Sequence, residues 1–151
     1  MSSGFVHLHT HSSYSPMWGI PTLEALCQAA RTQGQDRLAL TDTNGLYGAI
    51  RFLEVAKHEG LKPILGAELV HKAHRAVLLA KTPAGYANLC RLLSARHEES
   101  TFDFIAAVAR YRAGLIILSD DLSALRTWRK DSPKDVYVKL TPGSDIQEAI
   151  T

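Results

Sequence analysis

The strongest constraint on the fold of this 151-residue chain is the alternation of short apolar runs with helical patterns from one end to the other. The apolar runs predict strands over residues 5–10, 37–41, 63–69, 75–81, 115–119 and 136–140. Apolar residues at helical spacing predict helices between Thr22 and Gly34 and over about 46–60, 86–97, 102–112 and 122–129. Repeated strand-helix units of this kind predict an α/β fold.

The predicted strand over 115–119 is uninterruptedly apolar at 116–118, which is typical of a strand buried on both faces. This burial indicates a parallel sheet covered by helices, either open or closed into a barrel. In parallel α/β folds, functional side chains gather at the carboxyl ends of the strands. The metal-binding side chains that fall near such ends are His9, His11, Asp42 and Glu68.

Composition narrows the class of protein. The chain is 46% hydrophobic and 21% charged, with a net charge of +2, which is typical of one globular domain and unlike a disordered chain or a strongly basic nucleic-acid-binding surface. No apolar stretch is long enough to span a membrane. Cys27 and Cys90 lie in helical, apolar patterns, so we expect free thiols and a reducing cytoplasm.

Histidines alternate with other residues at the start of the chain. His7, His9 and His11 are interleaved with Val6 and Leu8, so a strand would place all three imidazoles on one face, roughly 6 to 7 Å apart. An expression tag would be a contiguous run of histidines, which this segment is not. Because imidazole is the commonest protein ligand of metals, the pattern predicts a metal site.

Three segments carry a family resemblance. They read His-Leu-His-Thr-His-Ser-Ser-Tyr-Ser over 7–15, Leu-Thr-Asp-Thr-Asn-Gly-Leu-Tyr-Gly over 40–48 and Lys-Pro-Ile-Leu-Gly-Ala-Glu over 62–68. In order and spacing they resemble the motifs of the PHP (polymerase and histidinol phosphatase) domain. The segments 77–81 and 85–94 resemble the version at the N-terminus of bacterial DNA polymerase III alpha subunits, particularly the error-prone branch.

The resemblance implies a partial, distorted PHP-type (β/α) barrel, with residues 1–151 as an incomplete N-terminal portion of the domain. It implies that His9 and His11 are metal ligands and that Glu68 bridges metal ions. We expect Zn or Mn, with Mg as an alternative, to be bound weakly, at sites that are partly occupied or lost. Clustered ions of this kind activate water for attack on a phosphoester.

Two positions depart from the family pattern. Thr43 stands where the family has a histidine after Thr-Asp, and Trp18 stands where the polymerase branch has an aspartate. Both family residues hold the same metal, so we expect one subsite to be lost, with Trp18, Thr43 and His7 lining the site. The candidates for substitute ligands are His71, His74 and His97, each of which also has a simple structural interpretation.

Other polar residues have competing interpretations. Asp42 is either a metal ligand, an acceptor that orients a histidine, or part of an Asx turn with Asn44. We expect Asp120 and Asp121 to form a loop or a helix cap rather than a catalytic pair. The serines 12, 13 and 15 lack a catalytic triad context, which favours hydrogen bonds within their loop.

The expected function is that of a metal-binding module of an error-prone DNA polymerase III alpha-like protein, with weak or no hydrolytic activity of its own. Its expected partners are DNA or other replication proteins, reached through the parent polymerase, and no membrane is involved. The alternatives are a free-standing metal-dependent phosphoesterase and a non-catalytic structural module. Thr43 and Trp18 argue against the phosphoesterase.

Overall fold

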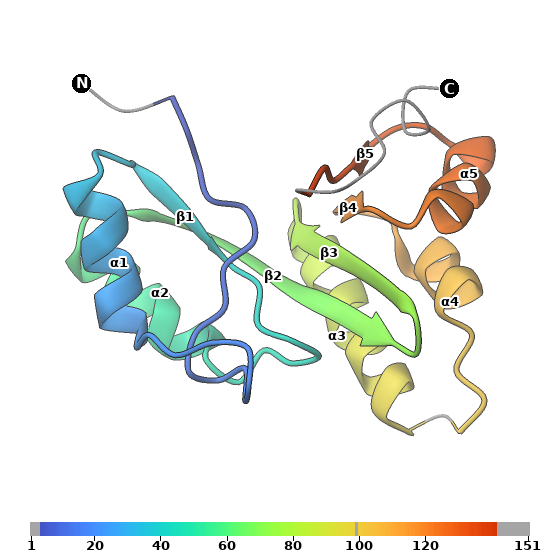
Figure 1. Ribbon diagram of the computed structural model, residues 1–151, viewed down its shortest axis with the longest axis horizontal. Coiled ribbons are helices and arrows are strands. Elements are labelled where there is room, and N and C mark those ends of the chain that lie inside the picture. Colours follow the sequence, from blue (N-terminus) through green and yellow to red (C-terminus); the bar gives the residue numbers. More distant parts are fainter. Residues whose placement is uncertain (1–3, 99, 142–151) are drawn as a thin grey trace. The chain divides into compact units, whose positions relative to one another are not determined.

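The computed structural model describes residues 4–98 and 100–141 and has a mixed α/β fold (Figure 1). It divides into two compact units, Met1–Glu68 and Leu69–Thr151. Each unit combines strands with helices that cover them, so the predicted α/β class is confirmed. No helix in the described part of the chain is both long and apolar enough to cross a membrane.

The first unit is built on a parallel pair of strands. β1 (Arg37–Leu40) pairs in parallel with β2 (Lys62–His71), with Leu40 opposite Leu65. Two helices, α1 (Leu23–Thr32) and α2 (Ala49–His58), pack against each other, and α1 also packs against β1. The buried core of this unit consists of Leu23, Cys27, Ala30, Leu38, Leu40, Phe52, Val55, Ala56 and Leu61.

The helix α1 forms where the sequence predicts it. The Thr22 side chain accepts a hydrogen bond from the backbone N–H of Ala25 at 3.2 Å, which satisfies a donor that the first helical turn leaves unpaired. Past the end of the helix, Gly34 has φ of 73°, a backbone conformation that favours glycine. Thr22 and Gly34 therefore lie at the two ends of the helix, as the sequence predicts.

The predicted strand over 5–10 is not a regular strand, which corrects the sequence prediction. The N-terminal segment is hydrogen-bonded to β1, because the amides of Ala39 and Thr41 donate to the carbonyls of His7 and Thr10 at 3.0 and 2.9 Å. The acceptors are three positions apart, whereas the donors are two positions apart. The N-terminal segment therefore carries one extra residue, which interrupts a regular ladder as a bulge does.

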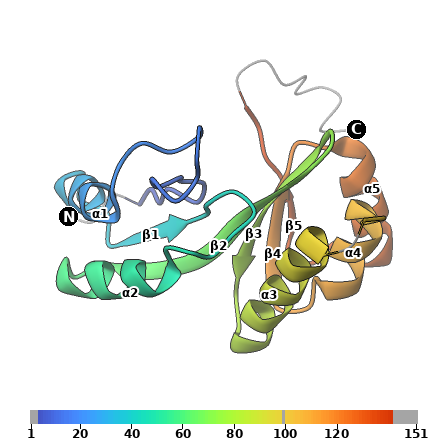
Figure 2. The same ribbon diagram turned by 90° about the horizontal axis from the view of Figure 1, so that it is seen from below.

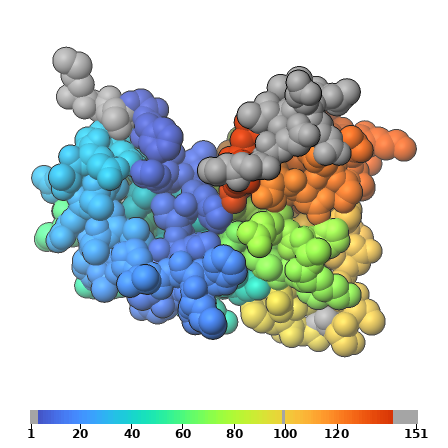
Figure 3. Space-filling model, viewed as in Figure 1, coloured from blue at the N-terminus to red at the C-terminus, as the bar shows by residue number. Residues whose placement is uncertain are grey.

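The same extra residue explains why the three imidazoles do not share a face. A shift of one residue turns side chains to the opposite side of an extended segment. His9 and His11 approach Glu68, whereas the His7 ring lies edge-on against Phe5, with ring centroids 4.9 Å apart. The blue atoms of this segment form part of the surface of the first unit (Figure 3), and Leu8 is exposed rather than buried in a core.

The second unit contains a mixed rather than an all-parallel set of strands. Its elements are β3 (His74–Ala80), α3 (Pro83–Glu98), α4 (Phe104–Tyr111), β4 (Leu115–Ser119), α5 (Leu122–Asp131) and β5 (Val136–Val138). β3 pairs with β4 antiparallel, and β4 pairs with β5 in parallel. The parallel sheet indicated by the apolar run at 116–118 was therefore only partly right, since this run does not reveal the direction of its partner.

Helices cover the strands of the second unit. α3 lies along β3 and also contacts β4 and α4 (Figure 2). The core contains Trp128 of α5, whose indole N–H donates to the carbonyl of Ile105 at 3.0 Å. The Phe104 ring stacks on His74 and is tilted against Trp128, with ring centroids 5.4 and 5.9 Å away. Aromatic packing therefore joins α4 and α5 to the start of β3.

Candidate metal centre

His9, His11 and Glu68 come together in the first unit. In the described ranges 4–98 and 100–141 they form the one group of three or more His, Cys, Asp and Glu side chains whose ligand atoms could surround an ion. The Nε2 atom of His9 lies 3.4 Å from Oε1 of Glu68, and that of His11 lies 3.1 Å from Oε2. The two imidazole rings meet edge to face, with centroids 4.8 Å apart.

Two observations indicate that these three residues can bind a metal ion. The Nε2 atoms of His9 and His11 are buried, and neither makes a hydrogen bond. Buried polar atoms are nearly always hydrogen-bonded, so two unbonded nitrogen atoms that face one carboxylate indicate a binding site for a metal ion. Ligands about 2.0–2.1 Å from a tetrahedral zinc ion are about 3.3 Å apart, close to the observed separations.

Backbone pairing beyond β1 positions the carboxylate. Thr43 pairs with Glu68 as an isolated parallel bridge, the Glu68 N–H donates to the Asp42 carbonyl at 3.1 Å, and the Asn44 N–H donates to the Glu68 carbonyl at 2.8 Å. Glu68 is thereby fixed beside the carboxyl end of β1, where α/β folds place their sites. The Thr43 hydroxyl also donates to Oε2 of Glu68 at 3.3 Å.

The electrostatics of Glu68 suit a ligand. Burial alone would raise the pKa of Glu68, but the imidazoles of His11 and His9 that face the carboxylate hold this pKa well below its ordinary value. Glu68 is 3% exposed, while the side chains of His9 and His11 are 27% and 14% exposed. The centre therefore offers a buried anionic oxygen ligand and two imidazoles with limited access from solvent.

Asp42 lies beside this group but is engaged elsewhere. Its Oδ1 accepts hydrogen bonds from the Ser12 N–H at 2.7 Å and the Ser15 hydroxyl at 2.6 Å, and its Oδ2 accepts from the Ser12 hydroxyl at 2.8 Å. All three side chains are buried. We call Asp42, Ser12 and Ser15 the serine-aspartate cluster. It ties the loop after His11 to the loop after β1, and a ligand role for Asp42 stays a prediction.

The other predicted site-lining residues divide into two groups. Thr43 contacts Glu68, and the Trp18 ring lies edge-on to His11 with centroids 6.4 Å apart, so both lie at the centre. The His7 ring packs against Phe5, and the His7 backbone N–H donates to the side-chain oxygen of Gln35 at 3.5 Å. His7 is not in the group of side chains that converge on Glu68. That Thr43 and Trp18 line a metal site stays a prediction.

The histidines considered as substitute ligands belong to the second unit. Nδ1 of His74 contacts Oδ2 of Asp121, and His71 packs edge-on against Phe102 with centroids 5.2 Å apart. His97 is exposed in the last turn of α3. Asp121 caps α5 by accepting from the Ala124 N–H at 3.1 Å, as the sequence predicts for this aspartate.

Sequence reasoning did not pair the serines with Asp42. Ser15 and Asp42 are 27 positions apart, and no periodic pattern links a loop serine to a buried carboxylate at that distance. Ser12 and Ser15 were expected to form hydrogen bonds in their own loop. The Ser12 hydroxyl also does so, since it accepts from the Tyr14 N–H at 3.2 Å, whereas the Ser15 hydroxyl bonds to Asp42 and the Thr43 N–H. The only local signal is the cluster of small hydroxyl residues after His11.

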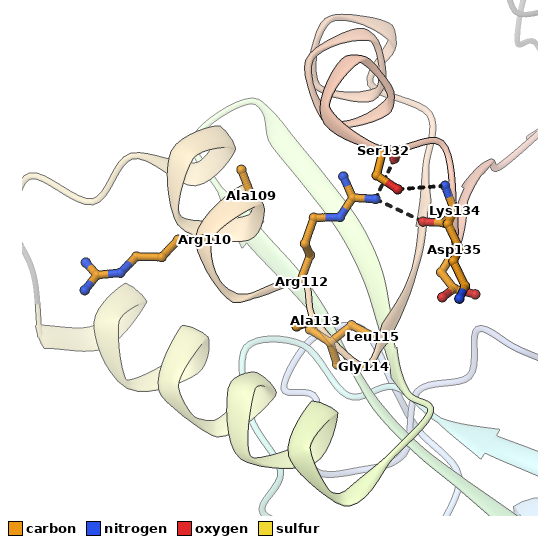
Figure 4. A pocket seen from close by; sticks show the side chains of 9 residues that line it. All are labelled: Ala109, Arg110, Arg112, Ala113, Gly114, Leu115, Ser132, Lys134 and Asp135. Atoms are coloured by element: carbon orange, nitrogen blue, oxygen red, sulfur yellow. Dashed lines mark hydrogen bonds between the residues drawn. The ribbon is translucent and has the colours of Figure 1, made fainter.

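A separate pocket of about 330 Å³ lies in the second unit (Figure 4). The Arg112 guanidinium in its wall donates to the carbonyls of Trp128, Ser132 and Lys134, the last two at 2.7 and 3.0 Å. This arginine therefore satisfies carbonyls at and beyond the end of α5, which helix ends leave unpaired. Among the residues that line this pocket, Asp135 is the one carboxylate, and none is a histidine or cysteine, so they form no group of metal ligands.

Two bacterial DNA polymerases are similar to this chain in sequence. An error-prone DNA polymerase from Symbiobacterium thermophilum is 47% identical over 94 residues, which cover 62% of this chain and 9% of that polymerase. A DNA polymerase III subunit alpha from Treponema pallidum is 35% identical over 140 residues, covering 79% of this chain and 12% of the relative. The chain thus spans about a tenth of the length of these curated relatives.

The fold has a counterpart among solved structures. A candidate metal-dependent phosphoesterase from Bifidobacterium adolescentis superposes with a TM-score of 0.66, covering 99% of this chain and 82% of its own, at 11% identity. At this identity the likeness concerns the fold alone. The sequence profile of the PHP domain matches residues 7–137, a range that contains His9, His11 and Glu68. With most of its length matched by that profile, the chain belongs to the PHP domain family.

Proposed function

We propose that this chain is the metal-binding PHP module of a DNA polymerase III alpha-like protein of the error-prone branch, with weak or no hydrolytic activity of its own. The observation that carries metal binding is the pair of buried Nε2 atoms, on His9 and His11, that face Glu68 without a hydrogen bond. The relatives named above support the polymerase parentage. DNA and replication proteins are then its partners through the parent protein, in the cytoplasm.

The chemistry available to such a module follows from its residues. A divalent ion bound there would supply Lewis acidity to a water molecule or a phosphoester oxygen. His9, His11 and Glu68 would hold the ion, and the Thr43 hydroxyl would orient the Glu68 carboxylate through its hydrogen bond. Zn and Mn suit two imidazoles and one carboxylate, and Mg suits them less because it prefers oxygen ligands.

A second candidate function is a free-standing metal-dependent phosphoesterase. It is favoured by the partial exposure of the His9 side chain, the part of the centre that solvent reaches most. Against it stands the position of Trp18, whose indole lies against His11 and supplies no metal ligand. We therefore rank turnover below metal binding.

Metal binding is tested on the full chain after removal of metals with a chelator. Calorimetric titration with Zn²⁺ and Mn²⁺ should show binding that is lost or weakened at least about tenfold in His9→Ala, His11→Ala and Glu68→Gln. The exposed histidine of α2 provides a control, because His58→Ala should bind as the wild type does. Equal affinity in the wild type and Glu68→Gln would contradict the proposed centre.

Hydrolysis separates the two functions. The metal-loaded chain is assayed with an aryl phosphate ester, and we expect turnover close to that of the metal-loaded buffer. Turnover that disappears in Glu68→Gln would instead establish the phosphoesterase. A chain that shows no metal binding and no turnover would favour a structural module.

A further inference from the structure

The surroundings of His9, His11 and Glu68 bear on how many ions the centre holds. We infer that it binds one divalent ion, because the hydroxyl of Thr43 is bonded to one oxygen of Glu68, Trp18 supplies no ligand, and Asp42 is held by three hydrogen bonds. This inference rests on the proposed metal binding and specifies its stoichiometry. It is carried by contacts that lie within the first unit.

The Asp42 carboxylate is engaged by the loops on either side of it. Asp42 is 2% exposed and accepts three hydrogen bonds, from one N–H and two hydroxyl groups. A carboxylate offers about four lone-pair positions, so an ion at Asp42 would have to share Oδ2 with the buried Ser12 hydroxyl. Loss of that bond would leave a buried donor unpaired, which is costly and favours a role for Asp42 in holding the loops.

The side of Glu68 that faces β1 is occupied by a neutral hydroxyl. Thr43 donates to Oε2 of Glu68, and its backbone N–H donates to the Ser15 hydroxyl at 2.9 Å. Ser15 is itself bonded to Asp42, so Thr43 is held in place from two directions. A second ion bound at Oε2 would compete with this hydroxyl and gain no charged or imidazole ligand in return.

The His11 ring also meets an indole. The Trp18 ring meets the His11 ring at 70°, with centroids 6.4 Å apart. Indole offers an N–H donor and no lone pair for a metal. Trp18, which is 60% exposed, therefore contributes no ligand beside His11.

Charge also favours one ion. Two neutral imidazoles and one carboxylate carry a charge of about −1, which one divalent ion converts to about +1. Two ions about 3.5–4 Å apart would leave an excess of about +3 beside buried groups, and like charges at this distance repel strongly where water is scarce. With the charge of the Asp42 carboxylate included, two ions would still leave an excess of about +2, whereas one ion would leave the group neutral.

One ion bound by two imidazoles and a carboxylate keeps coordination positions open. Three protein ligands with an open position are typical of catalytic rather than structural zinc sites. The ligands that can enter are small and oxygenous, such as water or one oxygen of a phosphate group. A phosphate group would therefore bind through one oxygen to the single ion, and no second ion would contact the same phosphate group.

The stoichiometry is measured by equilibrium dialysis of the metal-free full chain against Zn²⁺ or Mn²⁺, followed by elemental analysis. We expect one ion per chain in the wild type and in His58→Ala, and none in the His9→Ala, His11→Ala double variant. Two or more ions removed by that double variant would overturn the one-ion inference while leaving metal binding intact. No bound ion would overturn both this inference and the proposed function.

An optical titration locates the ion independently. Co²⁺ bound beside His11 should quench Trp18 fluorescence and saturate at one equivalent, because the indole lies against that ring. In the Trp18→Phe variant this quenching should disappear, which would assign the signal to the indole beside His11. Quenching that continues to a second equivalent would contradict a single ion at His11.

Discussion

At the scale of single residues, Asp42 contributes to the fold of the first unit through three short hydrogen bonds. In the Asp42→Ala variant, the N–H and hydroxyl of Ser12 and the hydroxyl of Ser15 lose their acceptor while remaining buried. We expect the free energy of unfolding to fall by about 2–4 kcal/mol, because each unpaired buried donor costs about 1–3 kcal/mol. Denaturant unfolding measures this change.

The neighbouring Ser13 provides a matched control for Asp42. Its side chain is exposed, so Ser13→Ala should change stability by less than about 0.5 kcal/mol. If Asp42→Ala is as mild as this control, the hydrogen bonds of Asp42 do not stabilise the loops as described.

The two cysteines differ in their environment, and labelling can distinguish them. Burial, followed by the nearby charges of Glu59 and Glu24, raises the pKa of the Cys27 thiol to about 11. Cys90 is half-buried on α3. At pH 8, maleimide should label native protein at Cys90, and the Cys90→Ser variant should stay unlabelled until it is unfolded.

The raised pKa of Cys27 also predicts how stability changes in base. The thiol favours the folded state fully below its ordinary pKa of 9.0, since the unfolded chain releases this proton first. The contribution is lost as pH rises toward about 11. Cys27→Ala should remove this part of the pH dependence, and an unchanged profile above pH 9 would contradict it.

Much of the centre could be predicted from single residues. His9, His11 and Glu68 follow from the motifs and converge as expected. The separation of His7 could not be predicted, because it depends on one extra residue against β1 that leaves no trace in the apolar alternation. The bond between Ser15 and Asp42 was equally hidden, since it joins two loops distant in sequence.

At the scale of elements, the start of α5 depends on Asp121. Its carboxylate caps the helix at the Ala124 N–H and contacts His74 and the Ser123 hydroxyl. Burial would raise the pKa of Asp121, but the bonds from His74, Ser123 and the Ala124 N–H lower it overall. Asp121→Ala should cost about 0.5–2 kcal/mol of stability through loss of the cap.

The pH dependence of this cap has a definite sign. A carboxyl group whose pKa is lowered on folding stabilises the protein above its ordinary pKa, and this contribution disappears as pH falls through the lowered value. Thermal unfolding of the wild type and Asp121→Ala should therefore converge in acid and differ at pH 7. Asp120→Ala is the neighbouring control, and a constant difference across acidic pH would contradict the argument.

Element boundaries were the best predicted feature of the fold. β4 begins and ends as the apolar run predicts, over Leu115–Ser119. The direction of its neighbour β3 was not predictable, because both orientations bury the same apolar residues. Strand direction depends on the chain between strands, and here α3 and α4 both intervene.

At the scale of the whole molecule, metal should stabilise the protein through its first unit. A ligand at 100 times its dissociation constant stabilises the folded state by about 2.7 kcal/mol. With Zn²⁺ bound by His9 and His11, hydrogen exchange should slow at the Ala39 and Thr41 amides, which donate to the segment that carries these imidazoles. A chelator should reverse the effect, and His11→Ala should abolish it.

If titration shows that the chain binds Zn²⁺ while the exchange rates of these two amides stay unchanged, the ion does not hold the N-terminal segment. Because the protein has two compact units, exchange at named amides is a sharper measure than one melting temperature.

The extra residue between His7 and Thr10 lies ahead of His11, and the single residue between His9 and His11 lets both imidazoles reach Glu68. If one residue were inserted between these two histidines, one imidazole would turn away from Glu68, since neighbouring side chains of an extended segment point to opposite sides. The chain would then lose its ion while retaining every histidine. Chain length between the two imidazoles is therefore as much a part of the ion-binding site as the imidazoles themselves.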